Sequence, residues 1–137
     1  MEENCIFCKI IKGEIPAFKV YEDSKYLAFL DISQFTEGHT LVIPKKHTQF
    51  IWDVDNIGEY MELVQKVGKH YKNLGYNFVD VMVFGRDVPH AHVHVIPNND
   101  NSVDYYEALS MLGNLQSDLS RRPDKDKGEK LVTKLKL

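Results

Sequence analysis

Five short segments rich in apolar residues predict β-strands along the chain. Runs of Val, Ile, Phe and Tyr bounded by Gly, Pro or Asp are typical of strands. The predicted strands lie at residues 18–22, 26–30, 40–43, 78–84 and 90–97. Apolar residues spaced three and four apart predict helices instead: a short one before Gly13, a long one in mid-chain and a later one that ends before Pro123.

The long helix has the clearest helical pattern. Asp53 or Asp55 can cap its start, and Gly75 ends it. Its expected apolar face consists of Ile57, Met61, Val64, Val67, Tyr71 and Leu74. Residues 131–137 alternate enough to form an edge strand in this chain or in a partner, and disorder is the other interpretation.

Short connections between the predicted strands define the fold class. Residues 85–89 alone separate the last two strands, so these are antiparallel neighbours, because a parallel pair needs a dozen or more connecting residues. We therefore expect an α+β fold: an antiparallel five-stranded sheet, one face covered by the long helix, with short N-terminal and C-terminal helices. A chain of 137 residues suits one domain, placed at residues 1–122, with a charged C-terminal tail at 123–137.

Charge is distributed unevenly and excludes some partners. Residues 121–137 carry seven Lys or Arg against three acids, a net +4, and because the whole chain carries −3 the remainder carries −7. Such an acidic body argues against a nucleic-acid surface. No apolar run is long enough to span a bilayer, and residues 1–4 lack the features of a signal peptide. We expect a cytoplasmic protein with no membrane partner.

Three histidines alternate with small or branched apolar residues in the last predicted strand. On a strand His90, His92 and His94 stand on one face, with about 6.6 Å between neighbours. One metal ion, held at about 2 Å by each imidazole, can collect two of them but hardly all three. Imidazole titrates near pH 6.5 and serves as nucleophile, acid–base or metal ligand. The row is therefore predicted to be an active site whose members differ in role.

Cys5 and Cys8 have the spacing of a zinc knuckle, although two buried structural cysteines or a redox pair would look the same. Together with His47 and one end of the histidine row they would make a closed, structural tetrahedral site. The spacing alone leaves these interpretations open. Two further polar residues lie beside predicted strands: His39 is either a ligand contact or a surface histidine, and Asp31 is a turn residue on sequence alone.

Taken together, these motifs resemble the histidine triad (HIT) nucleotide-binding protein family, in its bacterial-type branch with a Cys-x-x-Cys zinc site. Residues 90–96 fit the family's pattern of three histidines alternating with apolar residues. Residues 5–10 look like the opening of the bacterial branch, and residues 29–33 and 38–47 resemble two further family blocks. The resemblance covers roughly residues 4 to 97.

The resemblance implies an enzyme that cleaves at the α-phosphorus of a purine nucleotide, with adenosine the expected base. This is a nucleotide phosphoramidase, or a nucleotidyl hydrolase or transferase such as a dinucleoside polyphosphate hydrolase. His92 would attack the phosphorus and form a nucleotidyl-histidine, since an imidazole nitrogen needs no deprotonation near pH 7. His94 would hydrogen-bond the phosphate, and His39 would join the same network.

Further residues take roles by the same resemblance. Structural zinc would be held by Cys5, Cys8, His47 and His90. Asp31 would accept hydrogen bonds from the ribose, and the base would lie against Phe7, Ile10, Leu30 and Ile32. The family also implies a homodimer whose sheets join.

The loop before the triad departs from the family pattern. It is shorter, with Arg86 in the place of a Gln and Asp87 in that of a Ser or Thr. Arg86 can bind a phosphate bidentately, whereas Asp87 repels one unless it pairs with Arg86. One alternative is a nucleotide-binding regulatory protein with little turnover because of this loop. Another is a metallohydrolase with His92 and His94 as ligands, since a His-x-His pair on a strand can hold catalytic zinc. A DNA-repair deadenylase does not suit the acidic body.

Overall fold

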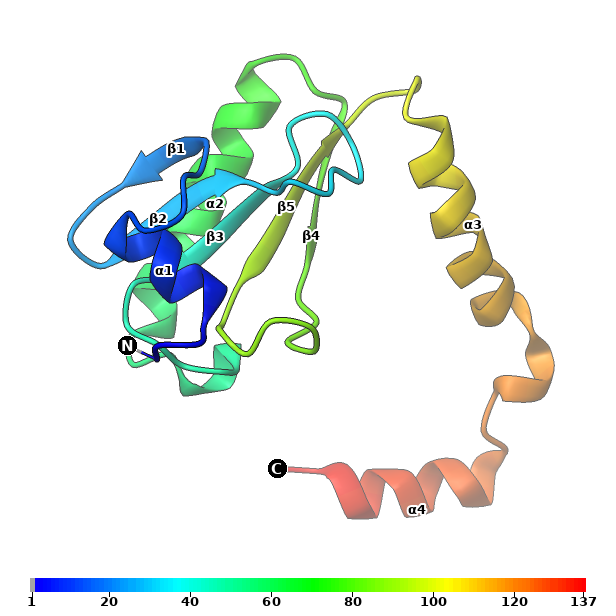
Figure 1. Cartoon of the computed structure of the whole chain (residues 1–137). Helices are drawn as coiled ribbons and strands as arrows, with labels where there is room; N and C mark the ends of the chain where they lie inside the picture. Colours follow the sequence, from blue (N-terminus) through cyan, green and yellow to red (C-terminus); the bar gives the residue numbers. More distant parts are fainter. Residues whose placement is uncertain (1) are drawn as a thin grey trace. The chain divides into compact units, whose positions relative to one another are not determined.

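The computed structural model describes residues 2–137, which form two compact units, one ending at Ser102 and the other comprising Val103–Leu137. The first unit is built on a five-stranded sheet and the second is helical (Figure 1). The α+β class expected from the sequence is confirmed. The proposed domain division between residues 122 and 123 stays a prediction.

All five strands pair antiparallel, in the order β1-β2-β3-β5-β4. Two predicted bounds are wrong, because β4 ends at Met82 and β5 starts only at Val93. The segment before β5 bonds to loops instead: the Ala91 N–H donates to the Thr48 carbonyl at 2.6 Å. The strands are β1 (Lys19–Glu22), β2 (Tyr26–Leu30), β3 (Thr40–Pro44), β4 (Phe78–Met82) and β5 (Val93–Asn98).

Helices cover both faces of the sheet, where the sequence suggested only one covered face. On one face α2 (Ile57–Asn73) packs against Ala28, Val42, Val93 and Val95. On the other, α1 (Ile6–Lys12) and its cap residue Cys5 pack against Leu27, Phe29, Leu41 and Ile43 (Figure 1). Successive side chains of β2 and β3 thus alternate between two apolar layers, which explains why these strands are apolar throughout.

The long helix differs from its prediction in cap and in face. Asn56, not Asp53 or Asp55, is the N-cap, and its Oδ1 accepts the Glu59 N–H at 3.2 Å. Ile57, Met61 and Leu74 are exposed, while Tyr60, Leu63, Val64, Val67 and Tyr71 are buried. The buried face of α2 is thus rotated about the helix axis relative to the predicted face. The Tyr60 hydroxyl donates to the Val42 carbonyl at 2.5 Å and directs this face toward the sheet.

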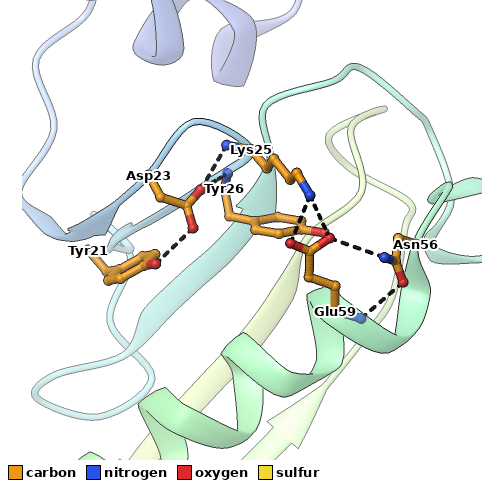
Figure 2. Close-up of polar contacts among 6 residues, drawn as sticks. All are labelled: Tyr21, Asp23, Lys25, Tyr26, Asn56 and Glu59. Carbon is orange, nitrogen blue, oxygen red and sulfur yellow. Dashed lines mark hydrogen bonds and ion pairs between the residues drawn. The ribbon is translucent and has the colours of Figure 1, made fainter.

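Polar contacts join the β1–β2 turn to the start of α2 (Figure 2). Asp23 accepts the backbone N–H groups of Lys25 and Tyr26, both at 2.7 Å, which closes the turn. Lys25 Nζ lies 2.9 Å from each carboxylate oxygen of Glu59, and Glu59 also accepts from Asn56 Nδ2 at 3.1 Å (Figure 2). These exposed ion pairs add little stability but fix where the turn meets the helix.

The second unit contains α3 (Val103–Ser117), the 3-10 turn η2 (Leu119–Arg121) and α4 (Lys125–Leu135). The predicted later helix is confirmed, but the edge strand or disorder expected at residues 131–137 is wrong, because α4 extends to Leu135. Asp124 caps α4 by accepting the Lys127 N–H at 2.9 Å. No helix in the described part of the chain is long and apolar enough to cross a membrane. The cytoplasmic location stays a prediction.

Candidate functional site

The sheet order places the candidate residues along the central strands β3 and β5, from the β2–β3 connection at one end to the segment before β5 at the other. His39 comes immediately before β3 and Asp31 immediately after β2, so the β2–β3 connection carries both. His94 lies within β5 opposite Leu41 of β3, and His90 and His92 precede β5. Opposed residues share a face of the sheet, so His94 lies on the face that α1 covers.

One group of four side chains meets at the start of α1. Cys5 caps this helix, and its Sγ accepts the Cys8 N–H at 3.5 Å. His90 Nδ1 lies 3.4 Å from Cys5 Sγ and 3.6 Å from Cys8 Sγ, and His47 Nδ1 lies 3.3 Å from Cys8 Sγ. All four ligand atoms are within 4.8 Å of one another. The structure thus groups the four residues named as metal ligands.

The geometry of this group suits a tetrahedral zinc ion. Zn–S of about 2.3 Å and Zn–N of about 2.05 Å give a sulfur–nitrogen edge of about 3.6 Å, close to the three contacts above. His90 Nε2 lies 2.7 Å from the Pro44 carbonyl, which can only accept, so Nε2 carries the proton and Nδ1 offers its lone pair to the thiols. Burial raises the pKa of the Cys8 thiol, so a bound metal would have to displace its proton.

His92 is oriented by the backbone of its own segment. Its Nδ1 lies 2.6 Å from the carbonyl oxygen of His90, so Nδ1 donates a proton and Nε2 is left unprotonated. The imidazole also makes an edge-on contact with the ring of Phe7, with 5.3 Å between the centroids, and this contact restricts its orientation further. His92 therefore presents a free nitrogen lone pair, the form in which an imidazole acts as a nucleophile.

His39 and His94 form a second chain of hydrogen bonds. The backbone N–H of Phe35 donates to His39 Nδ1 at 3.1 Å, so His39 carries its proton on Nε2. That nitrogen lies 2.9 Å from His94 Nδ1 and 3.6 Å from Asp31 Oδ2. His94 Nδ1 is therefore the acceptor, and the proton of His94 lies on Nε2, where it can be donated to a ligand.

Burial favours the neutral form of His39, His90 and His94. It is the largest cause that lowers the pKa of His94 to about 4, and the neighbouring His92 and His39 lower it further. Burial also lowers the pKa of His39, against the opposing effect of Asp31, and that of His90. The tautomers derived above apply to neutral rings, so they hold around pH 7.

Asp31, His39 and His94 also lie close enough to hold a metal ion, with ligand atoms within 4.8 Å. Their hydrogen bonds favour a different role. The facing nitrogens of His39 and His94 already share one proton, and the Phe35 N–H occupies the other nitrogen of His39. A metal would have to strip a proton from a neutral imidazole. This arrangement disfavours a metal ion held by Asp31, His39 and His94, while the metallohydrolase hypothesis, with His92 and His94 as ligands, stays a prediction.

An apolar cavity of about 230 Å³ lies beside the triad. It is lined by every residue predicted to contact the base or ribose: Phe7, Ile10, Leu30, Asp31 and Ile32. Phe7 connects the cavity to the triad, because it lines the cavity and its ring also contacts that of His92 edge-on. Phe18, Phe29 and Leu41 line it as well and were missed. The alternation of β2 and β3 contained this signal, because Phe29 and Leu41 share one face.

Comparison with known proteins gives a consistent answer. The HIT domain model matches residues 12–101. A protein named hit from Bacillus subtilis is 47% identical over 103 residues, which are 69% of this chain and 71% of that protein. The structure of a HIT family member from Bacillus subtilis matches with a TM-score of 0.68 at 36% identity, covering 90% of this chain and 99% of the other. The chain belongs to the HIT family.

Two further HIT relatives have more specific descriptions. An adenosine 5′-monophosphoramidase of Saccharomyces cerevisiae is 38% identical over 104 residues, or 73% of this chain and 66% of that protein. The structure of a Zn-bound histidine triad family protein from Mycobacterium smegmatis matches with a TM-score of 0.61 at 31% identity, covering 92% of this chain and 86% of the other.

The loop before the triad is exposed. Arg86 and Asp87 both face solvent, and in the described part of the chain no ion pair joins them. In the same loop Phe84 touches the ring of His94 edge-on, with 5.4 Å between centroids. Phe35, on the β2–β3 connection, stacks on His39 at 4.7 Å. Neither aromatic contact was predicted, because both depend on loop conformation, which leaves no periodic pattern in the sequence.

His94 should make the folded protein less stable in acid. The unfolded chain binds a proton at this residue near pH 6.5 and the folded chain only near pH 4. The free energy of unfolding therefore decreases as the pH falls between these values. The loss reaches about 2 kcal/mol by pH 5. His94→Gln, which cannot be protonated, should lose correspondingly less stability between pH 7.5 and pH 5 in urea unfolding. Equal losses in the two proteins would contradict the assignment.

Proposed function

We propose that this HIT protein hydrolyses the phosphoramidate bond of a purine nucleotide at the α-phosphorus, through a covalent nucleotidyl-histidine on His92. The observation that carries the proposal is the hydrogen bond from His92 Nδ1 to the His90 carbonyl, because it leaves Nε2 as a free nucleophile beside an apolar cavity. The phosphoramidase of Saccharomyces cerevisiae supports adenosine as the base.

The proposed reaction has two displacements. His92 Nε2 attacks the phosphorus, a P–N bond to the ring forms, and the bond to the leaving amine breaks. The ring becomes a cation whose Nδ1–H stays bonded to the His90 carbonyl, which stabilises the charge. His94 donates a hydrogen bond from Nε2–H to a phosphate oxygen, while the amine takes a proton from solvent as the P–N bond breaks and leaves as ammonia. Water then attacks the phosphorus, releases the nucleoside monophosphate and a proton, and restores neutral His92.

Binding is assigned to the residues around the cavity. The base lies between Phe7, Ile10, Leu30 and Ile32, and Asp31 accepts from the ribose with the oxygen that does not cap its own turn, since Oδ1 already accepts the Ser33 N–H at 2.8 Å. Arg86 is solvent-exposed and can reach a phosphate on an incoming nucleotide. The same site also suits transferase chemistry or a dinucleoside polyphosphate, where a nucleotide is the leaving group.

The first test is hydrolysis of adenosine phosphoramidate. Samples of the reaction are then stopped with a denaturant and without acid, and mass spectrometry is used to look for the nucleotidyl-histidine adduct. We expect the wild-type protein to release AMP and to gain the mass of an adenylyl group, and His92→Ala to lose both, with a rate at least about 10³-fold lower. His70→Ala, at an exposed histidine of α2, is the control and should keep full activity.

The alternative of a nucleotide-binding regulatory protein gives a different outcome in the same experiment. AMP would bind to the wild-type protein with measurable affinity, yet neither turnover nor an adduct would be detected. That result would end the enzyme proposal for this substrate class, and the altered loop at Arg86 and Asp87 would then explain the loss of turnover.

We also propose that Cys5, Cys8, His47 and His90 hold a structural zinc ion. The fit of their contacts to a tetrahedral site supports this, as does the Zn-bound relative from Mycobacterium smegmatis. Four protein ligands would leave no open position, so the ion would supply no Lewis-acid chemistry but would fix the segment that carries His92.

The zinc proposal predicts one ion per chain in protein purified without chelators. Cys8→Ser should lose the metal and melt at a temperature lower by about 10 °C or more, since structural zinc contributes folding free energy directly. Metal analysis and calorimetry measure both effects, with His70→Ala as the control. Stoichiometric zinc that survives in Cys8→Ser would contradict the ligand assignment.

A homodimer is the third proposal. In the described sheet β4 is an edge strand with one free side, and Phe78, Val81 and Phe84 on or beside it are about half exposed. An unpaired apolar edge invites pairing with a second copy of itself around a two-fold axis. Joining two β4 strands would give the continuous sheet that the family implies.

We expect sedimentation equilibrium to give twice the chain mass of 15.9 kDa. Val81→Arg should shift the protein to monomer, because it puts a charge in the apolar edge. Val20→Arg, at a similarly exposed position of the opposite edge strand β1, should leave the dimer unchanged. A wild-type monomer, or a dimer equally insensitive to both changes, would refute the β4 interface.

A further inference from the structure

The β2–β3 connection contains a polar side chain with no part in the proposed chemistry. Gln34 is exposed, yet its amide makes three hydrogen bonds to the backbone of its own loop. Its Nε2 donates to the carbonyls of Asp31 at 2.5 Å and His39 at 2.8 Å, and its Oε1 accepts the Gly38 N–H at 2.8 Å. Two acceptors on one side and a donor on the other fix the orientation of the amide.

These bonds join the two ends of the loop that carries Asp31 and His39. The Asp31 N–H also donates to the His39 carbonyl at 2.9 Å, so Gln34 strengthens a closure that the backbone begins. Gly38 at φ +96° has the left-handed backbone that turns its N–H toward Gln34, and a Cβ there would lie 3.0 Å from Pro97 Cγ. The loop thus has one tightly specified shape.

The shape of this loop determines where Phe35 directs its N–H. That N–H is the donor that makes His39 Nδ1 an acceptor. Were it to turn away, His39 could carry its proton on Nδ1, its Nε2 would become an acceptor toward His94, and His94 would have to donate from Nδ1. The proton on His94 Nε2, which faces the reacting phosphate in the proposed function, would then be missing.

We propose that Gln34 is a positioning residue: by holding the loop 31–39 closed it fixes the tautomer of His39, and through His39 the proton on His94 Nε2. Gln34 touches neither histidine ring and acts only through the backbone of the loop. The inference rests on the proposed function for its effect on rate, but the proton positions themselves do not depend on any activity.

The test combines nitrogen NMR with kinetics on the full-length protein. Long-range ¹⁵N–¹H spectra of the histidine rings distinguish protonated from unprotonated nitrogens. In the wild type we expect His39 and His94 both to be protonated at Nε2, and in Gln34→Ala both to exchange between tautomers. The kcat for adenosine phosphoramidate should fall roughly 10- to 100-fold, with KM changed less than about 3-fold.

Two further variants separate positioning from general damage. Gln34→Glu keeps an acceptor for the Gly38 N–H but puts a carboxylate oxygen against two carbonyls, so it should disturb the tautomers at least as much as Gln34→Ala. Gln65→Ala removes another exposed glutamine, from α2, and should change neither spectrum nor kcat.

Two results would overturn the proposal. One is an unchanged pair of tautomers in folded Gln34→Ala and Gln34→Glu. The other is a fall in kcat without any change at His39 and His94, which would make Gln34 merely structural. If the wild-type protein shows no turnover but Gln34→Ala still alters the tautomers of His39 and His94, the proposed function is refuted and the positioning role of Gln34 remains.

Discussion

A single backbone carbonyl, that of His90, joins the two halves of this site. It accepts the Nδ1–H of His92 at 2.6 Å, while the ring of the same residue faces the thiols of Cys5 and Cys8. Whatever fixes His90 therefore also fixes the proton and the direction of the His92 ring. The Cys–His group at the start of α1 therefore affects the triad as well. Contacts that hold the ring of His90 in place also restrict His92, because both depend on the position of one residue.

Burial contributes as much as hydrogen bonding to the chemistry of the histidines. A histidine in water would be partly protonated just below neutral pH, and a ring with protons on both nitrogens cannot accept a hydrogen bond from a neighbour. Desolvation lowers the pKa of His94 to about 4 and also lowers the pKa values of His39 and His90, so these three rings are neutral. Neutral rings have one proton each, and fixed backbone donors and acceptors then decide which nitrogen carries it.

The sequence predicted those parts of the site that depend on alternation or on close spacing. The expectation of three histidines on one strand was wrong in part, because β5 starts at Val93 and both His90 and His92 precede it. The structure nevertheless groups His90 with the cysteines and His94 with His39, as the family resemblance implied. Contacts that depend on loop conformation were not predictable. Gln34 and Phe35 have no periodic pattern, and the cap of α2 fell to Asn56 because three polar candidates lie within four residues. The edge-strand prediction for residues 131–137 failed because a short amphipathic segment suits either period, and the Asp124 cap decides for a helix.

The altered loop at Arg86 and Asp87 affects one part of the site more than the other. The nucleophile is oriented from the His90 carbonyl, and the proton of His94 is set from the β2–β3 connection through His39. Within the loop at 85–89 only the backbone of Val88 takes part, because its carbonyl accepts the His90 N–H at 2.8 Å. The hydrogen bonds that orient His92 and His94 do not involve the side chains of Arg86 and Asp87. Under the proposed function, the side chains of Arg86 and Asp87 would therefore act on how a phosphate is bound and which leaving group is accepted, rather than on the free nitrogen of His92 and the proton of His94. This separation favours a working enzyme with an altered substrate over a protein that has lost its chemistry.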